Sequence, residues 1–293
     1  MGMSKTKTKS INFSIFEFMK KHQHEMSFAS RDGMTHRLTA MFKELHQLGY
    51  LPTHIRFVRE KHIAALVEHW QEKGIADATI KNRMSDLRFV CRQFDRSNVI
   101  KSNDAYAIKR RSYAPKVNKA IPKIDLTNVQ DRHLRTSLEL QRVFGLRREE
   151  CIKIIPSLAD HGDMLFLQSS WTKGGIARQV PILTDEQRFW LTQAKWFAGS
   201  GNSLIPEHRS YIQQRNLYES EMKRLALHNL HGLRHAYAQK RYKMMTGWEC
   251  RLNGGKSRAE MTSKERAADL DARRIISKEL GHGRVEVARV YCG

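Results

Sequence analysis

The sequence predicts a two-domain protein that is mainly α-helical, with one small antiparallel β-sheet in its second half. Its 293 residues exceed what one ordinary domain of roughly 100–150 residues uses. Apolar side chains recur at helical spacing through most of the first third of the chain. Two adjacent glycines, Gly174 and Gly175, separate two runs of β-prone residues, which indicates a turn between strands.

Residues 1–108 are expected to form a helical domain. Four short amphipathic helices are predicted there, at 15–24, 38–48, 63–70 and 77–94. Glycine follows the second and third of these helices closely, and glycine is a common residue at the end of a helix. Basic side chains lie mostly off the apolar stripe of the fourth helix, so the outer face of this small bundle is predicted to be cationic.

A basic segment at 109–122 is expected to link two domains, because it contains a proline and loses the helical period. The second domain, 123–293, is predicted to begin with a helix at 134–144. Short strands are expected at 164–167, 170–173 and 178–182.

The chain from residue 185 onward is again expected to be mostly helical. The exception is a polar stretch at 253–271, which shows no clear apolar stripe.

The charge of the chain points to nucleic acid as its partner. Lys and Arg number 52 against 30 Asp and Glu, which gives a formal charge of +22 spread along the whole sequence. Such a charge opposes compaction unless the phosphates of a polyanion neutralise it. We therefore expect contacts to DNA phosphates from basic residues of the fourth helix and the linker. These are Lys81, Arg83, Arg88, Arg92, Arg110, Arg111 and Lys116.

No apolar run approaches the roughly 20 residues that a membrane span needs. We therefore expect a cytoplasmic protein that is associated with the nucleoid and not with a membrane.

Short motifs in the second half carry residues suited to breaking a phosphodiester bond. Without a metal, that reaction needs a nucleophile, cations to balance the charge of a five-coordinate phosphorus, and an acid for the leaving oxygen. Arginine suits the phosphoryl oxygens because its guanidinium stays charged and can contact two of them. Arg147 lies three residues before Glu150, whose carboxylate could fix the guanidinium.

Two further motifs supply imidazoles and a phenol. His231 and Arg234 are spaced to lie on one face of a helical turn. His282 follows a Leu-Gly pair, and Tyr291 comes nine positions later (291 − 282). Any one of these residues alone would more often serve packing or a surface ion pair; their order and spacing favour a shared site.

These motifs resemble the active-site motifs of the tyrosine recombinase, or phage integrase, family. The family's G-L-R-x-x-E, H-x-x-R and L-G-H motifs, the last with a tyrosine nine residues on, are matched in order. The matching residues are Arg147 with Glu150, His231 with Arg234, and His282 with Tyr291. The family's hairpin lysine is matched by Lys173, beside the Gly-Gly turn.

The resemblance implies a helical, SAM-like core-binding domain at 1–108 and a mixed α/β catalytic domain at 123–293. It implies that Tyr291 attacks a phosphate of double-stranded DNA to give a 3′-phosphotyrosine and a free 5′ hydroxyl. Further roles follow from the motifs: Arg147 and Arg234 hold the non-bridging oxygens, His231 and His282 bind them or move the tyrosine proton, Lys173 protonates the leaving oxygen, and Glu150 supports Arg147.

The resemblance also implies the partners. The phosphotyrosine stores the energy of the broken bond, so neither a metal nor another cofactor is expected. Two paired DNA sites, each cut on both strands, imply a homotetramer that assembles from monomers and integrates or excises a mobile element. An accessory DNA-bending or directionality protein would be a further partner.

Three alternatives stand beside this interpretation. A type IB topoisomerase uses the same chemistry, and a catalytically inactive DNA-binding regulator could keep the fold. His228, His231 and His235 could form a zinc site on one helix, but Gly232 stands where the H-E-x-x-H motif needs glutamate.

One departure from the family pattern concerns spacing. His231 and His282 lie 51 positions apart (282 − 231), farther than is usual in the family. The polar piece at 248–271 is therefore expected to be an insertion.

Overall fold

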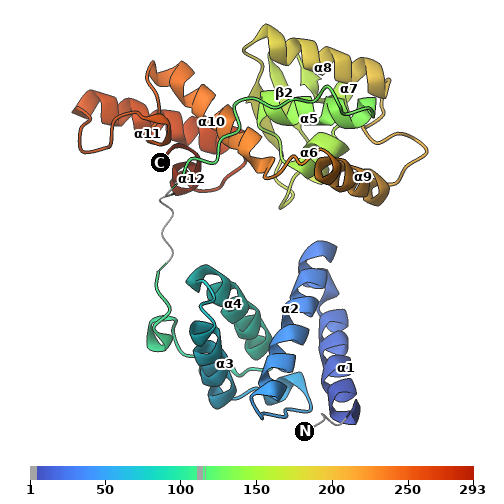
Figure 1. Cartoon of the computed structure of the whole chain (residues 1–293), viewed down its shortest axis with the longest axis vertical. Coiled ribbons are helices and arrows are strands. Elements are labelled where there is room, and N and C mark those ends of the chain that lie inside the picture. The colour runs from blue at the N-terminus through green and yellow to red at the C-terminus, as the bar shows by residue number, and fades with distance from the viewer. Residues whose placement is uncertain (1–4, 111–114, 116) are drawn as a thin grey trace. The chain divides into compact units, whose positions relative to one another are not determined.

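The computed structural model describes residues 5–110, 115 and 117–293, and the chain divides into two compact units, Met1–Arg111 and Ser112–Gly293 (Figure 1). The predicted linker at 109–122 falls partly on residues 111–114 and 116, so Arg111 and Lys116 lie outside the described residues. The boundary between the two units lies inside the predicted linker and does not test the predicted domain limits at 108 and 123.

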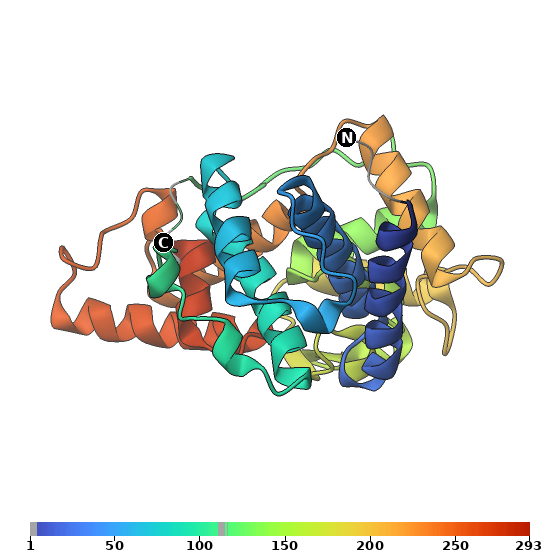
Figure 2. The same cartoon turned by 90° about the horizontal axis from the view of Figure 1, so that it is seen from below.

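The first unit is a helical bundle, as the sequence predicts (Figures 1 and 2). Its helices are α1 (Lys5–Lys21), α2 (Phe28–Gln47), α3 (Glu60–Glu72) and α4 (Asp77–Gln93), with 3₁₀ turns η1 (Gln23–Glu25), η2 (Ile55–Phe57), η3 (Ser97–Val99) and η4 (Asp104–Tyr106). The apolar stripes of the four helices face one another and form a single core.

Trp70 of α3 is the largest side chain in that core and is fully buried. Its indole N–H donates to Glu44 Oε2 at 2.6 Å. The guanidinium of Arg83 lies over the indole ring at 4.8 Å and donates to the same carboxylate oxygen at 3.3 Å. The tryptophan therefore buries its ring without leaving its polar atom unsatisfied.

The second unit combines helices with a three-stranded sheet (Figure 1). Its helices are α5 (Arg132–Phe144), α6 (Arg148–Lys153), α7 (Pro156–Ala159), α8 (Asp185–Ala198), α9 (Tyr211–Arg224), α10 (His231–Thr246), α11 (Ser263–Glu279) and α12 (Arg289–Cys292). Its strands are β1 (Asp160–His161), β2 (Met164–Leu167) and β3 (Arg178–Pro181). The 3₁₀ turns are η5 (Ser169–Trp171), η6 (Arg251–Asn253) and η7 (Val285–Ala288).

The sheet corrects one prediction. Residues 170–173 do not form a strand, because Ser169–Trp171 is the 3₁₀ turn η5 and Trp171 is buried there. The antiparallel partner of β3 is β2, in a register that pairs Leu165 with Val180. The connection is therefore longer than a two-residue hairpin, and Gly174 and Gly175 lie within it at positive φ.

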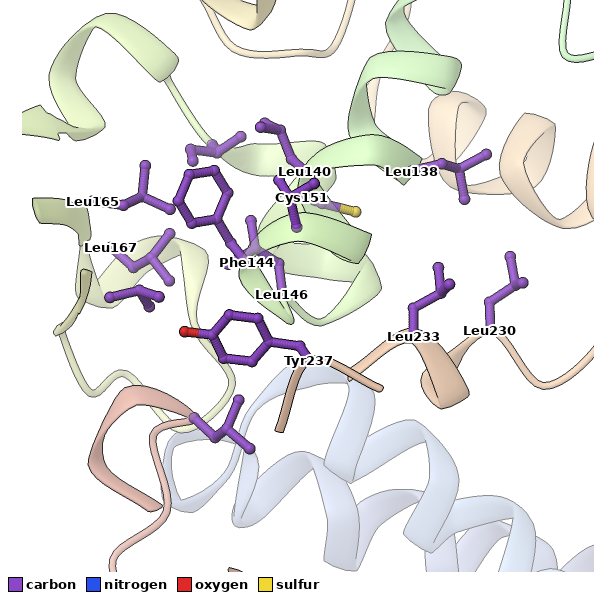
Figure 3. Packing of buried hydrophobic residues seen from close by; sticks show 14 of the residues in the cluster. Leu138, Leu140, Phe144, Leu146, Cys151, Leu165, Leu167, Leu230, Leu233 and Tyr237 are labelled. Atoms are coloured by element: carbon purple, nitrogen blue, oxygen red, sulfur yellow. The ribbon is translucent and has the colours of Figure 1, made fainter. Parts of the chain in front are cut away.

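Helix α5 lies in the core of the second unit. Figure 3 shows Leu138, Leu140 and Phe144 of this helix packed among Leu165 and Leu167 of the sheet and Leu233 and Tyr237 of α10. Leu138, Leu140 and Phe144 are fully buried. Burial of such side chains contributes roughly 1.5–3 kcal/mol each relative to exposure, so this cluster anchors the elements that carry the candidate site.

Helix α11 corrects the prediction for the polar stretch. The helix begins at Ser263, capped by the Thr262 hydroxyl, which accepts from the backbone N–H of Glu265. The apolar pattern misses its start because Asp269 takes a buried position, where it accepts from the hydroxyl of Tyr242 at 2.7 Å. The hydrogen-bonded pair of Asp269 and Tyr242 thus lies where regular apolar spacing would place an apolar side chain.

Within the described residues no helix is both long enough and apolar enough to cross a membrane.

Gly145 ends α5 in the left-handed region, at φ 61°, with α10 packed against it. A Cβ atom at this position would lie 2.6 Å from Cδ1 of Tyr237. We expect Gly145→Ala to lower the free energy of unfolding by about 2–5 kcal/mol, the sum of left-handed strain and overpacking.

The matched control is Gly162→Ala, at φ 70° with no atom within 4 Å of the place that the added methyl carbon would take. The Gly162 variant should lower the free energy of unfolding only by the left-handed strain, about 1–2 kcal/mol. Urea unfolding of both variants checks the difference; equal losses would contradict the role of the contact with Tyr237.

Candidate active site

Five of the residues singled out in the sequence come together in the second unit through direct contacts. They are Arg147, Glu150, Arg234, His282 and Tyr291. The contributing segments are the start of α6, the first turn of α10, the residues after α11 and helix α12. Contacts between segments so far apart in the sequence are set by packing, since α10 contacts α5, α11 and α12.

Arg234 lies at the centre and is fully buried. Its Nη1 donates to the carbonyl of Gly145 at 2.6 Å, and its Nη2 donates to the carbonyl of Leu280. Its Nε donates to the hydroxyl oxygen of Tyr291 at 3.4 Å. Burial lowers the pKa of Arg234 to about 10, so the group is still a cation at neutral pH. Three of the five N–H groups of this guanidinium are used, which leaves two for another acceptor.

Tyr291 lies in α12 and is only 3% exposed. Nε2 of His282 lies 3.0 Å from its hydroxyl oxygen. The hydroxyl therefore has an imidazole on one side and a buried guanidinium on the other. This arrangement can take the proton of the phenol and stabilise negative charge that develops nearby.

Three imidazoles surround the phenol, and all have lowered pKa values. Burial, with the positive charge of Arg234, lowers the pKa of His282 to about 4. Burial, with the neighbouring His231, lowers the pKa of His235 to about 4. The pKa of His231 is lowered by partial burial of its ring and by the charge of Arg234. His282 and His235 are therefore neutral at pH 7, and a neutral imidazole can accept a proton.

Arg147 and Glu150 are held by local geometry at the start of α6. Glu150 is fully buried and accepts from the backbone N–H of Arg147 at 2.7 Å and from its Nη1 at 2.8 Å. Burial alone would raise the pKa of Glu150, but hydrogen bonds and charge from Arg178 and Arg147 outweigh it and lower the pKa to about 2. Arg147 remains partly exposed, with its guanidinium aimed by the carboxylate.

His231 and Lys173 lie outside the group of residues that are in direct contact. His231 is the first residue of α10, keeps part of its surface exposed to solvent, and has its ring centroid 6.2 Å from that of Tyr291. Lys173 is exposed in the loop between η5 and β3, and within the described part of the chain no hydrogen bond or ion pair joins it to the other predicted residues. The Thr172 hydroxyl closes this loop by donating to the carbonyl of Ile176 at 2.8 Å.

Sequence reasoning missed two residues of the site. Arg178 of β3 is buried and donates through both Nη atoms to Glu150, at 2.8 and 2.6 Å. The alternation of β3 could have indicated it, because Arg178 shares the inward face with Val180 and a buried arginine needs a carboxylate. His235, considered only as a zinc ligand, packs on Tyr291 with ring centroids 4.6 Å apart.

Gly232 has a steric role in the same turn. A Cβ atom there would lie 2.4 Å from the carbonyl oxygen of Lys119. The backbone N–H of Ile121 donates to the Gly232 carbonyl at 3.0 Å. The glycine of the H-x-x-R motif thus lets the segment around residues 119–121 lie against the start of α10.

The residues expected to contact DNA differ in their exposure and in the contacts that they make within the first unit. Arg83 is engaged with Trp70 and Glu44, and Arg88 donates to the carbonyl of Lys101 and to Asn103 Oδ1. Arg92 and Arg110 are exposed, and Lys81 is half-buried. Arg83 and Arg88 therefore serve packing within the first unit, whatever else they contact.

Among the described residues, no three His, Cys, Asp or Glu side chains form a group that could hold a metal ion. His228 is exposed, while His235 is buried with its Nδ1 unpaired in the described structure.

Two family descriptions match the sequence. One, described as integrase, matches residues 108–240, and the other, described as the N-terminal part of phage integrase, matches residues 17–100. No curated protein matches the sequence.

Solved structures share the fold at low sequence identity. A lambda integrase dimer bound to a COC′ core site is 17% identical, with a TM-score of 0.57 over 95% of this chain and 76% of that one. The Tn1549 transposon integrase bound to circular intermediate DNA is 15% identical, with a TM-score of 0.52 over 97% and 95%. The XerH recombinase bound to difH is 14% identical, with a TM-score of 0.56 over 96% and 81%.

The buried imidazole of His235 makes stability depend on pH. Its pKa is about 4 in the folded chain against an ordinary 6.5, so between these values the unfolded chain binds a proton that the folded chain does not. Stability is therefore lost as the pH falls from 6.5 towards 4, at up to about 1.4 kcal/mol per pH unit for this group.

We expect His235→Phe, which keeps an aromatic ring against Tyr291, to flatten this dependence. Urea unfolding at pH 5, 6 and 7 measures the slope, with His208→Phe at an exposed position as the baseline. A slope unchanged from wild type would show that His235 takes up its proton in the folded chain.

Proposed function

Because the chain belongs to the phage integrase family of tyrosine recombinases, we propose that Tyr291 is the nucleophile with which it cuts and rejoins DNA. The chain is a site-specific recombinase; the roles of its individual residues are our assignment. The observation that carries the assignment is the Tyr291 hydroxyl between His282 Nε2 at 3.0 Å and Arg234 Nε at 3.4 Å.

Cleavage begins with transfer of the phenolic proton. Neutral His282 accepts it at Nε2 as the Tyr291 oxygen attacks the phosphorus. The bond from phosphorus to the 5′ oxygen breaks, which leaves a 3′-phosphotyrosine and a 5′ alkoxide. Lys173 donates a proton to that oxygen; its exposed loop supports this role, because DNA has to bring the leaving group to it.

Two arginines and a histidine stabilise the transition state. The two unused N–H groups of Arg234 and the free edge of Arg147 bind the non-bridging oxygens. His231, at the start of α10, adds a hydrogen bond to the same phosphate. Because these groups are held before DNA arrives, little free energy is spent on ordering them during the reaction.

Rejoining is the reverse of cleavage. A 5′ hydroxyl from a second duplex attacks the phosphotyrosine and gives its proton to the neutral amine of Lys173. The bond from phosphorus to the tyrosine oxygen breaks, and His282 returns a proton to the phenol. The phosphotyrosine keeps the energy of the broken bond, so no nucleotide, metal or other cofactor enters these steps.

We propose that the substrate is double-stranded DNA carrying two paired sites, and that four copies act on them while the free chain is a monomer. A lambda integrase tetramer bound to a Holliday junction has the same fold, and the charge of +22 suits contact with duplex phosphates. Integration or excision of a mobile element, aided by a DNA-bending or directionality protein, would take place on nucleoid DNA in the cytoplasm.

We expect Tyr291→Phe to abolish covalent attachment to DNA and to leave DNA affinity nearly unchanged, because one oxygen and no charge is removed. The measurement is capture of covalent protein–DNA complexes from cells, followed by sequencing of the attached DNA. Tyr211→Phe, in α9 and outside the site, is the control and should trap DNA as wild type does. Adduct that persists in the Tyr291 variant would assign the reaction to another tyrosine.

Cleavage and binding should respond to different arginines. Arg147→Ala should slow single-turnover cleavage of the captured site on the order of 10²–10³-fold, because it removes a preorganised donor. Arg110→Ala should instead weaken binding and reduce the slope of log affinity against log salt by about 0.9, one phosphate contact. Salt titrations and cleavage rates at saturating DNA test both. Normal cleavage by the Arg147 variant would contradict the active-site assignment.

A further inference from the structure

The carboxylate of Glu150 is saturated with donors. Its Oε1 accepts from Nη1 of Arg147 and Nη1 of Arg178, both at 2.8 Å. Its Oε2 accepts from the backbone N–H of Arg147 at 2.7 Å and from Nη2 of Arg178 at 2.6 Å. An ionised carboxylate offers about four acceptor sites, so Arg178 fills half of them.

Arg234 lies just outside this arrangement. Its Nη1 is 4.0 Å from Oε2 of Glu150, beyond hydrogen-bonding distance, and donates to the Gly145 carbonyl instead. If Arg178 were absent, the vacated sites on Glu150 would face this guanidinium. A buried carboxylate without its partner is strongly unfavourable, so it would draw Arg234 towards itself.

Arg178 also connects to the segment that carries His282. Its Nε donates to the carbonyl of Glu279 at 2.8 Å, one residue before the Leu280 carbonyl that Arg234 uses. A Cβ atom at Gly281 would lie 3.0 Å from Cδ of Arg178, at φ 65°. The glycine of the L-G-H motif therefore both turns the backbone and makes room for this side chain.

We propose that Arg178 is a positioning residue for strand cleavage, which occupies the Glu150 carboxylate so that Arg147 and Arg234 keep donors free for the phosphate. The proposal rests on the function proposed above. Arg178 is 7% exposed and, among the described residues, hydrogen-bonds to neither Tyr291 nor His282, so it acts through its neighbours and not on the reacting atoms.

Net charge supports the same role. Three arginines, the partly exposed Arg147 and the buried Arg178 and Arg234, surround one buried carboxylate, which leaves a net charge of +2 (3 − 1). Without Arg178 the sum falls to +1, while the phosphorane formed during cleavage carries about two negative charges.

The test compares two variants of Arg178 with a matched control. Arg178→Gln removes the charge and the paired donors, whereas Arg178→Lys keeps the charge but cannot bridge both oxygens. Arg142→Gln is the control, because Arg142 also joins two carboxylates, donating to Glu139 at 2.7 Å and to Glu186 at 2.8 Å, outside the site. All are assayed below their melting temperatures, on the DNA site captured from cells.

At saturating DNA, Arg178→Gln should cleave about 10²-fold more slowly in a single turnover, as expected for misplaced catalytic groups. Arg178→Lys should recover part of that loss, and DNA affinity should change little in either variant. Arg142→Gln should lose stability but cleave at the wild-type rate. If Arg178→Gln does not fold, the test rests on Arg178→Lys alone. Its single-turnover cleavage rate is expected to be at least several-fold below that of wild type.

Binding of orthovanadate, measured by calorimetry without DNA, separates this proposal from the proposed function. Wild type should bind it more tightly than Arg178→Gln, and Arg142→Gln should match wild type. If wild type binds orthovanadate in this pattern but cleaves no DNA, the proposed function fails and the role of Arg178 in the site stands.

Two results would overturn the proposal. One is folded Arg178 variants that cleave at the wild-type rate, which would leave Arg178 a purely structural residue. The other is a loss of DNA affinity with a normal rate at saturation, which would make it a DNA-binding residue. Wild type that neither cleaves DNA nor binds orthovanadate would overturn both proposals.

Discussion

Burial of the Arg234 cation is the constraint on which the second unit depends. A guanidinium removed from water is costly unless its donors find acceptors, and here the acceptors are backbone carbonyls of Gly145 and Leu280. Those carbonyls lie where α5 and α11 end, so satisfying one side chain fixes how two helices end around α10. Its Nε donates to the hydroxyl of Tyr291, and two N–H groups stay unused. The packing of one buried cation therefore also places positive charge and free donors beside that hydroxyl.

Much of the fold and the site could be predicted from the sequence. Helices with regular apolar spacing, such as α4 and α5, begin and end close to where the pattern indicates. The motifs around Arg147, Arg234, His282 and Tyr291 identified residues that meet in space, because short-range spacing within a helical turn or a helix end survives folding. The helical class and the family membership followed from the same local signals.

The rest depends on contacts that no local pattern encodes. Apolar spacing missed the start of α11 because Asp269 is buried against Tyr242, and it assigned a strand to residues that form η5 because Trp171 is buried from a 3₁₀ turn. Arg178 escaped notice because its carboxylate partner is 28 residues away in the sequence. Lys173 differs from the other residues of the motifs, because it lies exposed in a loop and its part in the site remains a prediction.

The contacts that build the site span 57, 89 and 101 residues of sequence, from Arg234 to Tyr291, from Arg234 to Gly145 and from Arg178 to Glu279. Such long loops close late in folding, since their entropy is lost before the contacts repay it. A partly folded chain would therefore expose its basic side chains before Tyr291 met Arg234 and His282. The group of contacts around Tyr291 is complete only in a chain in which β3, α10, α11 and α12 have all assembled.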